Sequence, residues 1–424
     1  MQITNISNGV EGYYIETSKF KTSRISINMF VKADEKDISA YSLLQMLLVS
    51  ATTEYPDYTS LNAALNELYG AALYSDVVKF GDMRIIKFVI AFLDDKFTMN
   101  KEVVSEKATE LLLSAIFNPP LYDGKFKASD FNNNKRLLVE QIRGEINDKR
   151  RYAIVNTEKL MYENEPAGIE RYGSAEVVES LSNEEIVKAH KKLLKEAFVR
   201  VNVVSQSNPQ KVFDKIGKSF EALNRNVEKL NVSKFHVNSG KVKTAEEHLD
   251  VTQGKLCIGF TLDSDGTRDD AAKSAVFVDM FGGGPYSKLF TNVREKQSLC
   301  YYCAARFDSK KSTFLVDSGV LEENREKAYN GILAQLDDMK KGLFTEDELN
   351  ASKMALCDAV ATVGDLAANL DNWYMMMTFN ENETTESYIN RIKDVNREDV
   401  ISKANSTSID SVYFLGGLKG GSNL

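Results

Sequence analysis

The sequence predicts an α+β protein made of two homologous domains, each with a mostly antiparallel sheet covered by helices. The chain has 424 residues, more than a single hydrophobic core usually accommodates, so two or three domains are expected. Strand-like runs alternate with segments of helical periodicity. The second half also repeats the order of the first. LSNEEIVKAH at Leu181 resembles VNREDVISKA at Val395, and each is a capped helix that precedes a strand.

A change of composition suggests the domain boundaries. Residues 226–249 are rich in Asn, Lys, Ser and Glu and show weak periodicity, which is typical of a connection between domains. Parts of this segment could pair as a strand. We therefore expect a first domain at 1–225, a linker at 226–249 and a second domain at 250–424.

The first half begins with two strands and a pair of helices. The strands expected there are 10–17, 24–31, 71–80, 84–92 and 198–204. The helices expected there are two within 40–71, then 101–117, 131–162, 183–195 and 209–223. Asp57 or Thr59 is expected to cap the second helix, and Gly81-Asp82 to join a hairpin. A pocket is expected where the first helix meets the sheet.

The second half follows the same plan. Its expected strands are 255–261, 299–307, 313–320 and 409–415. Its expected helices are 271–281, 287–297, 323–341, 345–360, 366–379, 387–392 and the one at Val395. A Gly282-Gly283-Gly284-Pro285 loop separates the first two of these helices. It follows a helix and lacks the Lys-Ser/Thr of a phosphate-binding loop, so we do not assign that function to it.

Composition excludes several classes of function. The net charge of -8 argues against non-specific nucleic-acid binding, which depends on Lys and Arg. No membrane span or secretory signal is evident, so a cytoplasmic protein with four free cysteines is expected. The three histidines, His190, His236 and His248, are far apart. No pair of them can form the helical i, i+4 ligand set of an H-x-x-E-H zinc site.

Three stretches carry a resemblance to a known family: LLQMLLVSATTEYP with LNELYGA, KRLLVEQI, and FGGGPYSKLFTNVREKQSLCYY. The chain resembles the insulinase, pitrilysin and mitochondrial processing peptidase family of zinc metallopeptidases, and within it the inactive bacterial subunits. The resemblance covers nearly the whole chain. It implies that the two domains form half of a clamshell around a chamber.

The resemblance also implies that a zinc site has been lost. Active members carry H-x-x-E-H where this chain has Ser42-Leu43-Leu44-Gln45-Met46. Ser42 and Met46 then replace the two histidine ligands, and Gln45 replaces the glutamate base. The third ligand corresponds to Gln141, or to Glu140 if the register slips by one. An amide is no base at neutral pH and a thioether binds zinc poorly, so no metal or cofactor is expected.

A second pair of residues follows from the same resemblance. Non-zinc subunits of heterodimeric members carry an Arg and a Tyr seven residues apart after the Gly-rich loop, the spacing of Arg294 and Tyr301. Such an Arg would bind a peptide carbonyl or carboxylate. The Tyr hydroxyl would donate to the oxyanion formed at the scissile carbonyl. The alternative is a surface Arg on a helix and a core Tyr on a strand.

Three other patterns receive structural interpretations. Cys300-Tyr301-Tyr302-Cys303 lies in an expected strand, where residues three apart point to opposite faces, so core thiols are favoured over a redox pair. The apolar run Trp373 to Met377 is expected to be core, with contact to the chamber as the alternative. Lys149-Arg150-Arg151 is expected to be a solvated helix face, with binding of acidic substrate as the alternative.

Together these features predict a non-catalytic, peptide-binding subunit of a heterodimeric zinc peptidase. Its partner would be a paralogue with an intact zinc motif, although a homodimer is also possible. The substrate would be an extended peptide or unfolded protein, bound in part by an exposed edge strand. One rival is a scaffold or binding protein of the same fold without a role in proteolysis. Another is an enzyme of different chemistry, with perturbed titratable groups away from Ser42 and Gln45.

Overall fold

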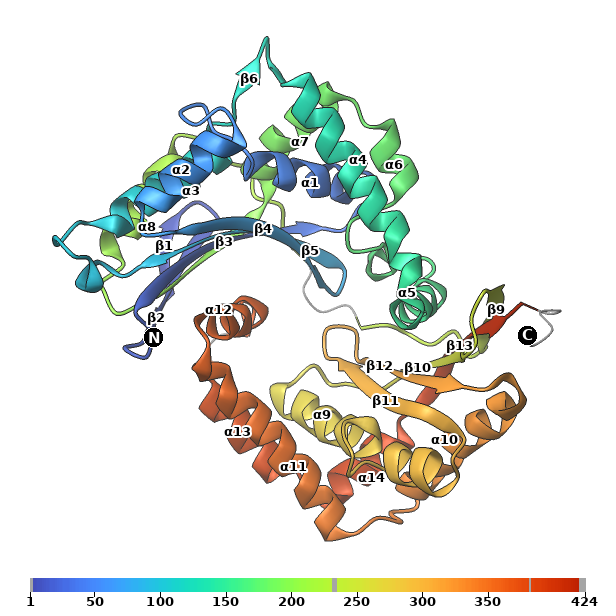
Figure 1. Cartoon of the computed structure of the whole chain (residues 1–424). Helices are drawn as coiled ribbons and strands as arrows, with labels where there is room; N and C mark the ends of the chain where they lie inside the picture. Colours follow the sequence, from blue (N-terminus) through green and yellow to red (C-terminus); the bar gives the residue numbers. More distant parts are fainter. Residues whose placement is uncertain (1–2, 231–234, 381–382, 419–424) are drawn as a thin grey trace. The chain divides into compact units, whose positions relative to one another are not determined.

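A computed structural model describes residues 3–230, 235–380 and 383–418. The chain forms two compact units. Unit 1 comprises Met1–Arg143, Ile169–Val232 and Val363–Glu381, and unit 2 comprises Gly144–Gly168, Ser233–Thr362 and Asn382–Leu424. Each unit contains one large sheet with helices on both faces (Figure 1).

The sheet of unit 1 has six strands in the order β1-β2-β8-β3-β5-β4. They are β1 (Ile3–Ser7), β2 (Val10–Glu16), β3 (Thr22–Lys32), β4 (Ala72–Phe80), β5 (Met83–Leu93) and β8 (Phe198–Ser205). All neighbours are antiparallel except β2 and β8, which are parallel. The central strands β3 and β5 are buried almost throughout, and the hairpin β4–β5 turns at Gly81-Asp82 as expected.

Helices cover one face of this sheet and form the core of unit 1 with it (Figure 1). They are α1 (Glu35–Leu48), α2 (Tyr58–Glu67), α3 (Val104–Phe117), α4 (Ala128–Gly144), α6 (Ala175–Ser180), α7 (Asn183–Glu196) and α8 (Gln210–Glu221). Capping residues determine where several of these helices begin. Asp57 caps α2 and Ser182 caps α7, each in a reciprocal capping box with the residue three positions on.

The sheet of unit 2 repeats this topology. Its order is β11-β12-β10-β13-β9, with β9 (Lys243–Leu249), β10 (Gly254–Thr261), β11 (Cys300–Asp308), β12 (Thr313–Val320) and β13 (Ser408–Gly417). Its single parallel pair, β9 and β13, corresponds to β2 and β8. The α+β prediction of two homologous domains with mostly antiparallel sheets is therefore confirmed.

The helices of unit 2 also follow the order of the first half. Those from the second half of the sequence are α9 (Arg268–Gly282), α10 (Arg325–Lys340), α11 (Glu346–Ala361), α13 (Thr385–Asp394) and α14 (Arg397–Asn405). The expected helix at 287–297 is a π-helical stretch, Leu289–Lys296, in which the Gln297 amide donates to the Asn292 carbonyl. Unit 1 also contains a small two-stranded sheet, in which β6 (Leu121–Tyr122) pairs with β7 (Lys125–Phe126).

Two helices are exchanged between the halves of the sequence. Helix α12 (Ala367–Met376) belongs to unit 1 and covers the sheet face opposite α1 and α7, whereas α5 (Lys149–Met161) belongs to unit 2 (Figure 1). The change from unit 1 to unit 2 in this part of the chain falls inside the expected linker 226–249, and the expected domains 1–225 and 250–424 did not include the exchanged segments. The expected linker 226–249 ends in β9, and its residues 231–234 lie outside the described part of the chain.

The exchange explains one wrong prediction. The helical tract expected at 131–162 is broken, because α4 ends at Gly144, a 3-10 turn follows, and Asp148 caps α5 by accepting from the Arg151 amide. The break coincides with the passage of the chain from unit 1 to unit 2. Periodicity alone could not separate two helices joined by so short a turn.

Helix α12 is fixed to unit 1 by a buried charge cluster. The Asp371 carboxylate accepts from Arg24 Nε at 2.7 Å and lies 2.7 Å from Lys87 Nζ. Ser26 and Asn202 donate to its other oxygen. Burial alone would raise the pKa of Asp371, but the charges of Lys87 and Arg24 outweigh burial and lower that pKa. Burial dominates at Lys87 and lowers the pKa of its ammonium group.

Candidate functional site

A pocket of about 590 Å³ lies in unit 1 where α1 meets β4, as the sequence predicts. Gln45 and Met46 line it from α1, Gln141 from α4, and Leu73 to Asp76 from β4. Further lining residues are Asp57, Tyr58, Lys127, Asp130, Asn133, Asn134 and Tyr172. Three of the four positions proposed as the vacated zinc site therefore converge on one cavity.

The side chains at these positions are already engaged with the protein. Gln45 Nε2 donates to the Ser42 carbonyl at 3.0 Å, and Gln45 Oε1 accepts from the Ser75 hydroxyl. Met46 packs against the hydrophobic core. Ser42 is fully buried, does not line the pocket, and its hydroxyl has no hydrogen-bond partner among the described residues. Gln45 thus holds α1 to β4, a structural role that needs no metal.

The structure distinguishes the two candidates for the third position. Gln141 lines the pocket, whereas Glu140 lies outside it and pairs with Arg136 on the exposed side of α4 at 2.7 Å. Among the described residues, no cluster of three or more His, Cys, Asp or Glu is arranged to hold a metal ion. The Gln141 amide is thus one of several polar groups that line the pocket.

The pocket adjoins the edge strand β4, whose outer side is only partly closed. The Val77 amide donates to the Asp76 carboxylate, and the Val77 carbonyl accepts from Arg171. Both main-chain groups of Val77 therefore point away from β5. Since this orientation repeats every second residue, the main-chain groups of Leu73 and Ser75 point outward too. No hydrogen bond from the described part of the chain reaches them, so the edge is closed at Val77 and open beside the pocket.

Arg294 and Tyr301 lie in unit 2 on consecutive elements. Arg294 is on the π-helical stretch, with its guanidinium 4.4 Å from the centre of the Phe290 ring and 3.5 Å from Glu295. Tyr301 is on the edge strand β11 and is 58% exposed. The register of β11 on β12 shifts between Cys300 and Tyr302, so a bulge projects Tyr301 from the sheet. The alternative of a core Tyr is therefore wrong.

The same bulge corrects the prediction for Cys300 and Cys303. Because Tyr301 is the extra residue, the two thiols do not point to opposite faces, and both are buried in the core of unit 2. A hydrogen bond from Cys303 lowers the pKa of Cys300, while the same contact raises that of Cys303. The prediction of core thiols is confirmed, although the argument from strand alternation was wrong.

Two other structural interpretations have different outcomes. Tyr374 and Met375 of the run Trp373 to Met377 are buried in unit 1, as expected for core residues. The prediction of a solvated face at Lys149 to Arg151 is wrong for Arg150. Its guanidinium binds the fully buried Asp317 at 2.5 Å and lies over the Tyr302 ring at 4.2 Å. Arg150 thereby attaches the exchanged helix α5 to β12.

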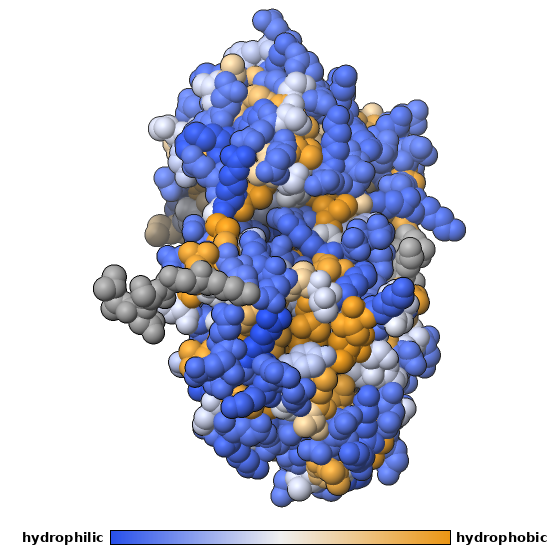
Figure 2. Space-filling view, turned by 90° about the vertical axis from the view of Figure 1, so that its right-hand side faces the viewer, coloured by the Kyte–Doolittle hydropathy of each residue, from blue (hydrophilic) through white to orange (hydrophobic). Residues whose placement is uncertain are grey.

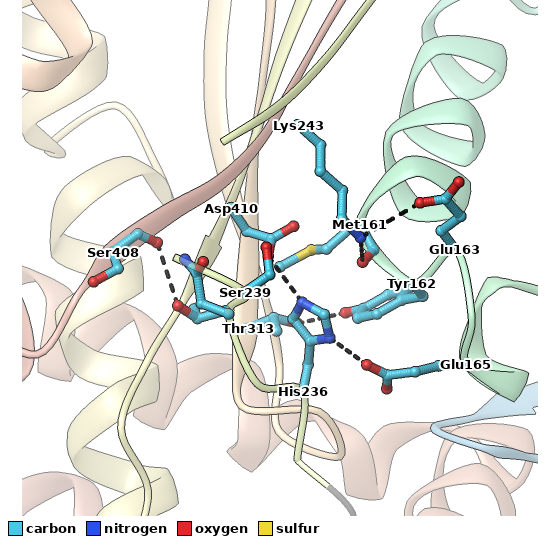
Figure 3. A network of polar contacts seen from close by, with 12 residues as sticks. Met161, Tyr162, Glu163, Glu165, His236, Ser239, Lys243, Thr313, Ser408 and Asp410 are labelled. Carbon is cyan, nitrogen blue, oxygen red and sulfur yellow. Dashed lines mark hydrogen bonds and ion pairs between the residues drawn. The ribbon is translucent and has the colours of Figure 1, made fainter. Parts of the chain in front are cut away.

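Sequence reasoning missed a polar network around His236 in unit 2 (Figure 3). His236 Nδ1 contacts Glu165 at 2.5 Å and Nε2 contacts Asp410 at 3.0 Å, while Lys311 binds the other oxygen of Glu165 at 2.5 Å. Burial opposes a charged imidazole, but the hydrogen bonds of Asp410 and Glu165 outweigh it and raise the pKa of His236. These residues are far apart in sequence. The only sequence feature that distinguishes His236 is that the chain has just three histidines.

Comparisons with known proteins support a single family. A sequence profile described as "Peptidase M16 inactive domain" matches residues 180–356. "Probable inactive metalloprotease YmfF" of Bacillus subtilis (strain 168) is 29% identical over 417 residues, which cover 98% of this chain and 97% of that protein. No helix in the ranges the structure describes has the length and apolar character needed to cross a membrane.

Solved structures share the fold over almost the whole chain. A conserved protein from Enterococcus faecalis V583 has a TM-score of 0.91 at 24% identity and covers 99% of both chains. A protease from Helicobacter pylori has a TM-score of 0.81 at 16% identity, covering 98% of this chain and 99% of that one. At these identities the likeness concerns the fold.

Proposed function

Because the chain belongs to the peptidase M16 family as an inactive homologue, we propose that it is the non-catalytic, peptide-binding subunit of a heterodimeric zinc peptidase. The partner is a paralogue that carries the intact H-x-x-E-H motif. The ligand is an extended peptide or an unfolded segment of protein. The observation that supports this function best is the pocket of unit 1 beside the open part of β4.

A bound peptide would extend the sheet of unit 1. The outward main-chain groups of Leu73 and Ser75 offer donors and acceptors to an added strand, which would place peptide side chains over the pocket. Asp76 and Arg171 limit the added strand at Val77. Because these hydrogen bonds involve main-chain groups, the site would suit ligands that share an extended conformation.

Replacement of Leu73 by proline tests the edge-strand contact. Proline is tolerated on an edge strand whose N–H faces outward, but it removes one main-chain donor. We expect the dissociation constant of an extended peptide, measured by fluorescence anisotropy, to rise about five- to tenfold, as for the loss of one hydrogen bond. Leu73→Ala keeps the donor and serves as the matched control. Equal affinities of the two variants would contradict binding through this edge.

The catalytic contribution of the subunit rests on Arg294 and Tyr301. Tyr301 is exposed in the β11 bulge, where its hydroxyl can meet a substrate carbonyl, and Arg294 offers a fixed charge. In a complex with the zinc-bearing partner, Tyr301→Phe is expected to lower the kcat of peptide cleavage about 100-fold, as for loss of one oxyanion donor. Arg294→Ala is expected to lower kcat/KM at least about tenfold.

These measurements also separate the proposal from its rival. Tyr302→Phe removes the neighbouring hydroxyl on β11, which has no hydrogen-bond partner among the described residues, and should leave cleavage unchanged. If Tyr301→Phe and Arg294→Ala leave the partner's cleavage unchanged as well, the subunit has no part in proteolysis. A scaffold or binding function of the same fold would then be the better assignment.

A further inference from the structure

The bulge in β11 places two thiols side by side in unit 2. Cys300 lies opposite Val320 of β12. Cys303 lies opposite Ser318, two residues away on the same strand. Because β12 pairs regularly with β10, Val320 and Ser318 point to the same face of the sheet. Cys300 and Cys303 therefore point to that face as well, and their thiols are within hydrogen-bond distance of each other.

The same bulge brings the two cysteines within reach of a disulfide. With Tyr301 as the extra residue, Cys300 and Cys303 are spaced along β11 like residues two apart, or about 6.6 Å. A disulfide accommodates Cα separations of about 4.4–6.8 Å. The pair is at the upper end of this range. Bond formation would therefore draw the two Cα atoms together and tighten the bulge that projects Tyr301.

The two thiols differ in the way that an oxidation pair requires. The hydrogen bond from Cys303 lowers the pKa of Cys300 against the effect of burial, and the charge of Arg294 lowers it further. The same hydrogen bond raises the pKa of Cys303. Cys300 thus becomes the nucleophilic thiolate more readily. Cys303 is the neighbour that can react with the oxidised form of Cys300.

Cys300 also lies at the accessible end of the pair. It is the first residue of the edge strand β11 and is 8% exposed. Two residues before it, Ser298 has a φ of 53°, a left-handed conformation that costs free energy for a residue other than glycine. The start of β11 therefore opens locally at a lower cost than regular backbone. A molecule as small as hydrogen peroxide can reach Cys300 there.

We propose that Cys300 and Cys303 form a reversible disulfide on reaction with hydrogen peroxide, and that this bond repositions Tyr301. The Cys300 thiolate attacks the O–O bond, which leaves a sulfenic acid on Cys300 and releases hydroxide. The Cys303 thiol attacks the sulfenic sulfur, forms the S–S bond and releases water. The hydroxide takes up the proton that Cys300 lost, so two thiols and one hydrogen peroxide give one disulfide and two waters. A dithiol reverses the reaction by exchange.

Peptide mapping of the full-length protein tests bond formation. The tryptic peptide 297–306 contains both cysteines, so an internal disulfide lowers its mass by two hydrogen atoms. We expect this mass after treatment with hydrogen peroxide and its loss after dithiothreitol. Cys303→Ser should instead give a sulfenic acid at Cys300 that dimedone labels. Cys357→Ser removes a thiol of α11 outside the bulge and, as the matched control, should form the disulfide as the wild type does.

A bond between two chains must be distinguished from the internal one. The side of unit 2 that faces the viewer in Figure 2 carries a hydrophobic area between hydrophilic borders, and such areas favour association between chains. Non-reducing gel electrophoresis after oxidation separates the two products. A peptide 297–306 that stays unbridged overturns the proposal, as does a disulfide that joins two chains or includes Cys357.

Hydrogen exchange tests the movement of Tyr301. The amides of residues 299–303 should exchange at different rates in the reduced and the oxidised protein. Equal rates would show that the bond leaves Tyr301 in place, and that outcome overturns the second half of the proposal. Far-ultraviolet circular dichroism confirms that each variant is folded.

Cleavage by the complex with the zinc-bearing partner tests the consequence, which rests on the function proposed above, whereas formation of the bond does not. The subunit is oxidised and freed of peroxide before the partner is added. We expect kcat to fall at least about tenfold, as for a misplaced catalytic group, and Cys300→Ser to keep full cleavage after the same treatment. If Tyr301→Phe lowers kcat but oxidation does not, the disulfide does not control Tyr301. If the disulfide forms and neither change affects cleavage, the peptidase role is wrong and the thiol pair stands.

Discussion

Replacing Asp371 by alanine is expected to lower the free energy of unfolding of unit 1 by about 3–5 kcal/mol. The carboxylate is fully buried between Arg24 and Lys87, whose side chains are 8% and 4% exposed. Removal of the carboxylate leaves two buried cations without a counter-charge, which costs more than the original ion pairs contribute. The effect should appear first at α12, because Asp371 joins that helix to Arg24 of β3 and to Lys87 of β5.

The chain provides its own reporter for this measurement. Its single tryptophan, Trp373, lies on α12 two residues from Asp371, so urea unfolding followed by tryptophan fluorescence observes unit 1. Asp365→Ala removes an exposed carboxylate, 3.7 Å from Lys19, and should leave the transition close to that of the wild type. If the Asp371→Ala transition also stays there, the cluster does not hold α12 in place.

The second large effect concerns pH and His236 in unit 2. The folded state raises the pKa of His236 above its ordinary value of 6.5. The stabilisation is therefore fully present below pH 6.5 and is lost as the pH rises through the higher folded value. Glu165 acts in the opposite sense. Burial would raise its pKa, but Lys311 and His236 lower it, so its contribution is lost as the pH falls through that lowered value.

Replacing His236 by alanine should therefore have two consequences. The free energy of unfolding of unit 2 should fall by about 3 kcal/mol below pH 6.5, because the fully buried Asp410 loses its partner. The decline of stability on raising the pH above 6.5 should largely disappear. Hydrogen exchange of β13 at a series of pH values measures both.

Asn238 provides a matched control in the same segment. Its side-chain amide donates to the Ile409 carbonyl of β13 at 2.9 Å and does not titrate, so Asn238→Ala should preserve the pH dependence of β13 exchange. An unchanged pH dependence in His236→Ala would mean that other groups are responsible.

Local features of the fold could be predicted because neighbouring residues determine them. The Asp57 and Ser182 caps and the Gly81-Asp82 turn depend on a few contiguous residues. The exchange of α5 and α12 could not be predicted in this way. It depends on contacts such as the one between Arg24 and Asp371, which lie 347 residues apart, and nothing in the local periodicity indicates which sheet a helix covers.

The candidate site was predictable to a similar extent. Family resemblance indicated Gln45, Met46 and Gln141, and the structure places these residues around one pocket. To choose between Gln141 and Glu140, one must know which face of α4 points toward the pocket. A single sequence does not define this orientation. The exposure of Tyr301 required the bulge, which is a property of the pairing of β11 with β12. Lys87, one of two charged residues in the mostly apolar strand β5, was a local sign of the buried cluster.

The exchanged helix α12 also has a consequence for synthesis on the ribosome. All strands of unit 1 have been made once β8 is complete at Ser205, but α12 begins only at Ala367. At about 5–20 residues per second, the delay is on the order of ten seconds or more. During this interval Arg24 and Lys87 lie on an uncovered sheet face without their counter-charge. The first half of the nascent chain therefore completes its folding only after α12 has been synthesised. The two halves of the sequence thus do not fold as two successive domains.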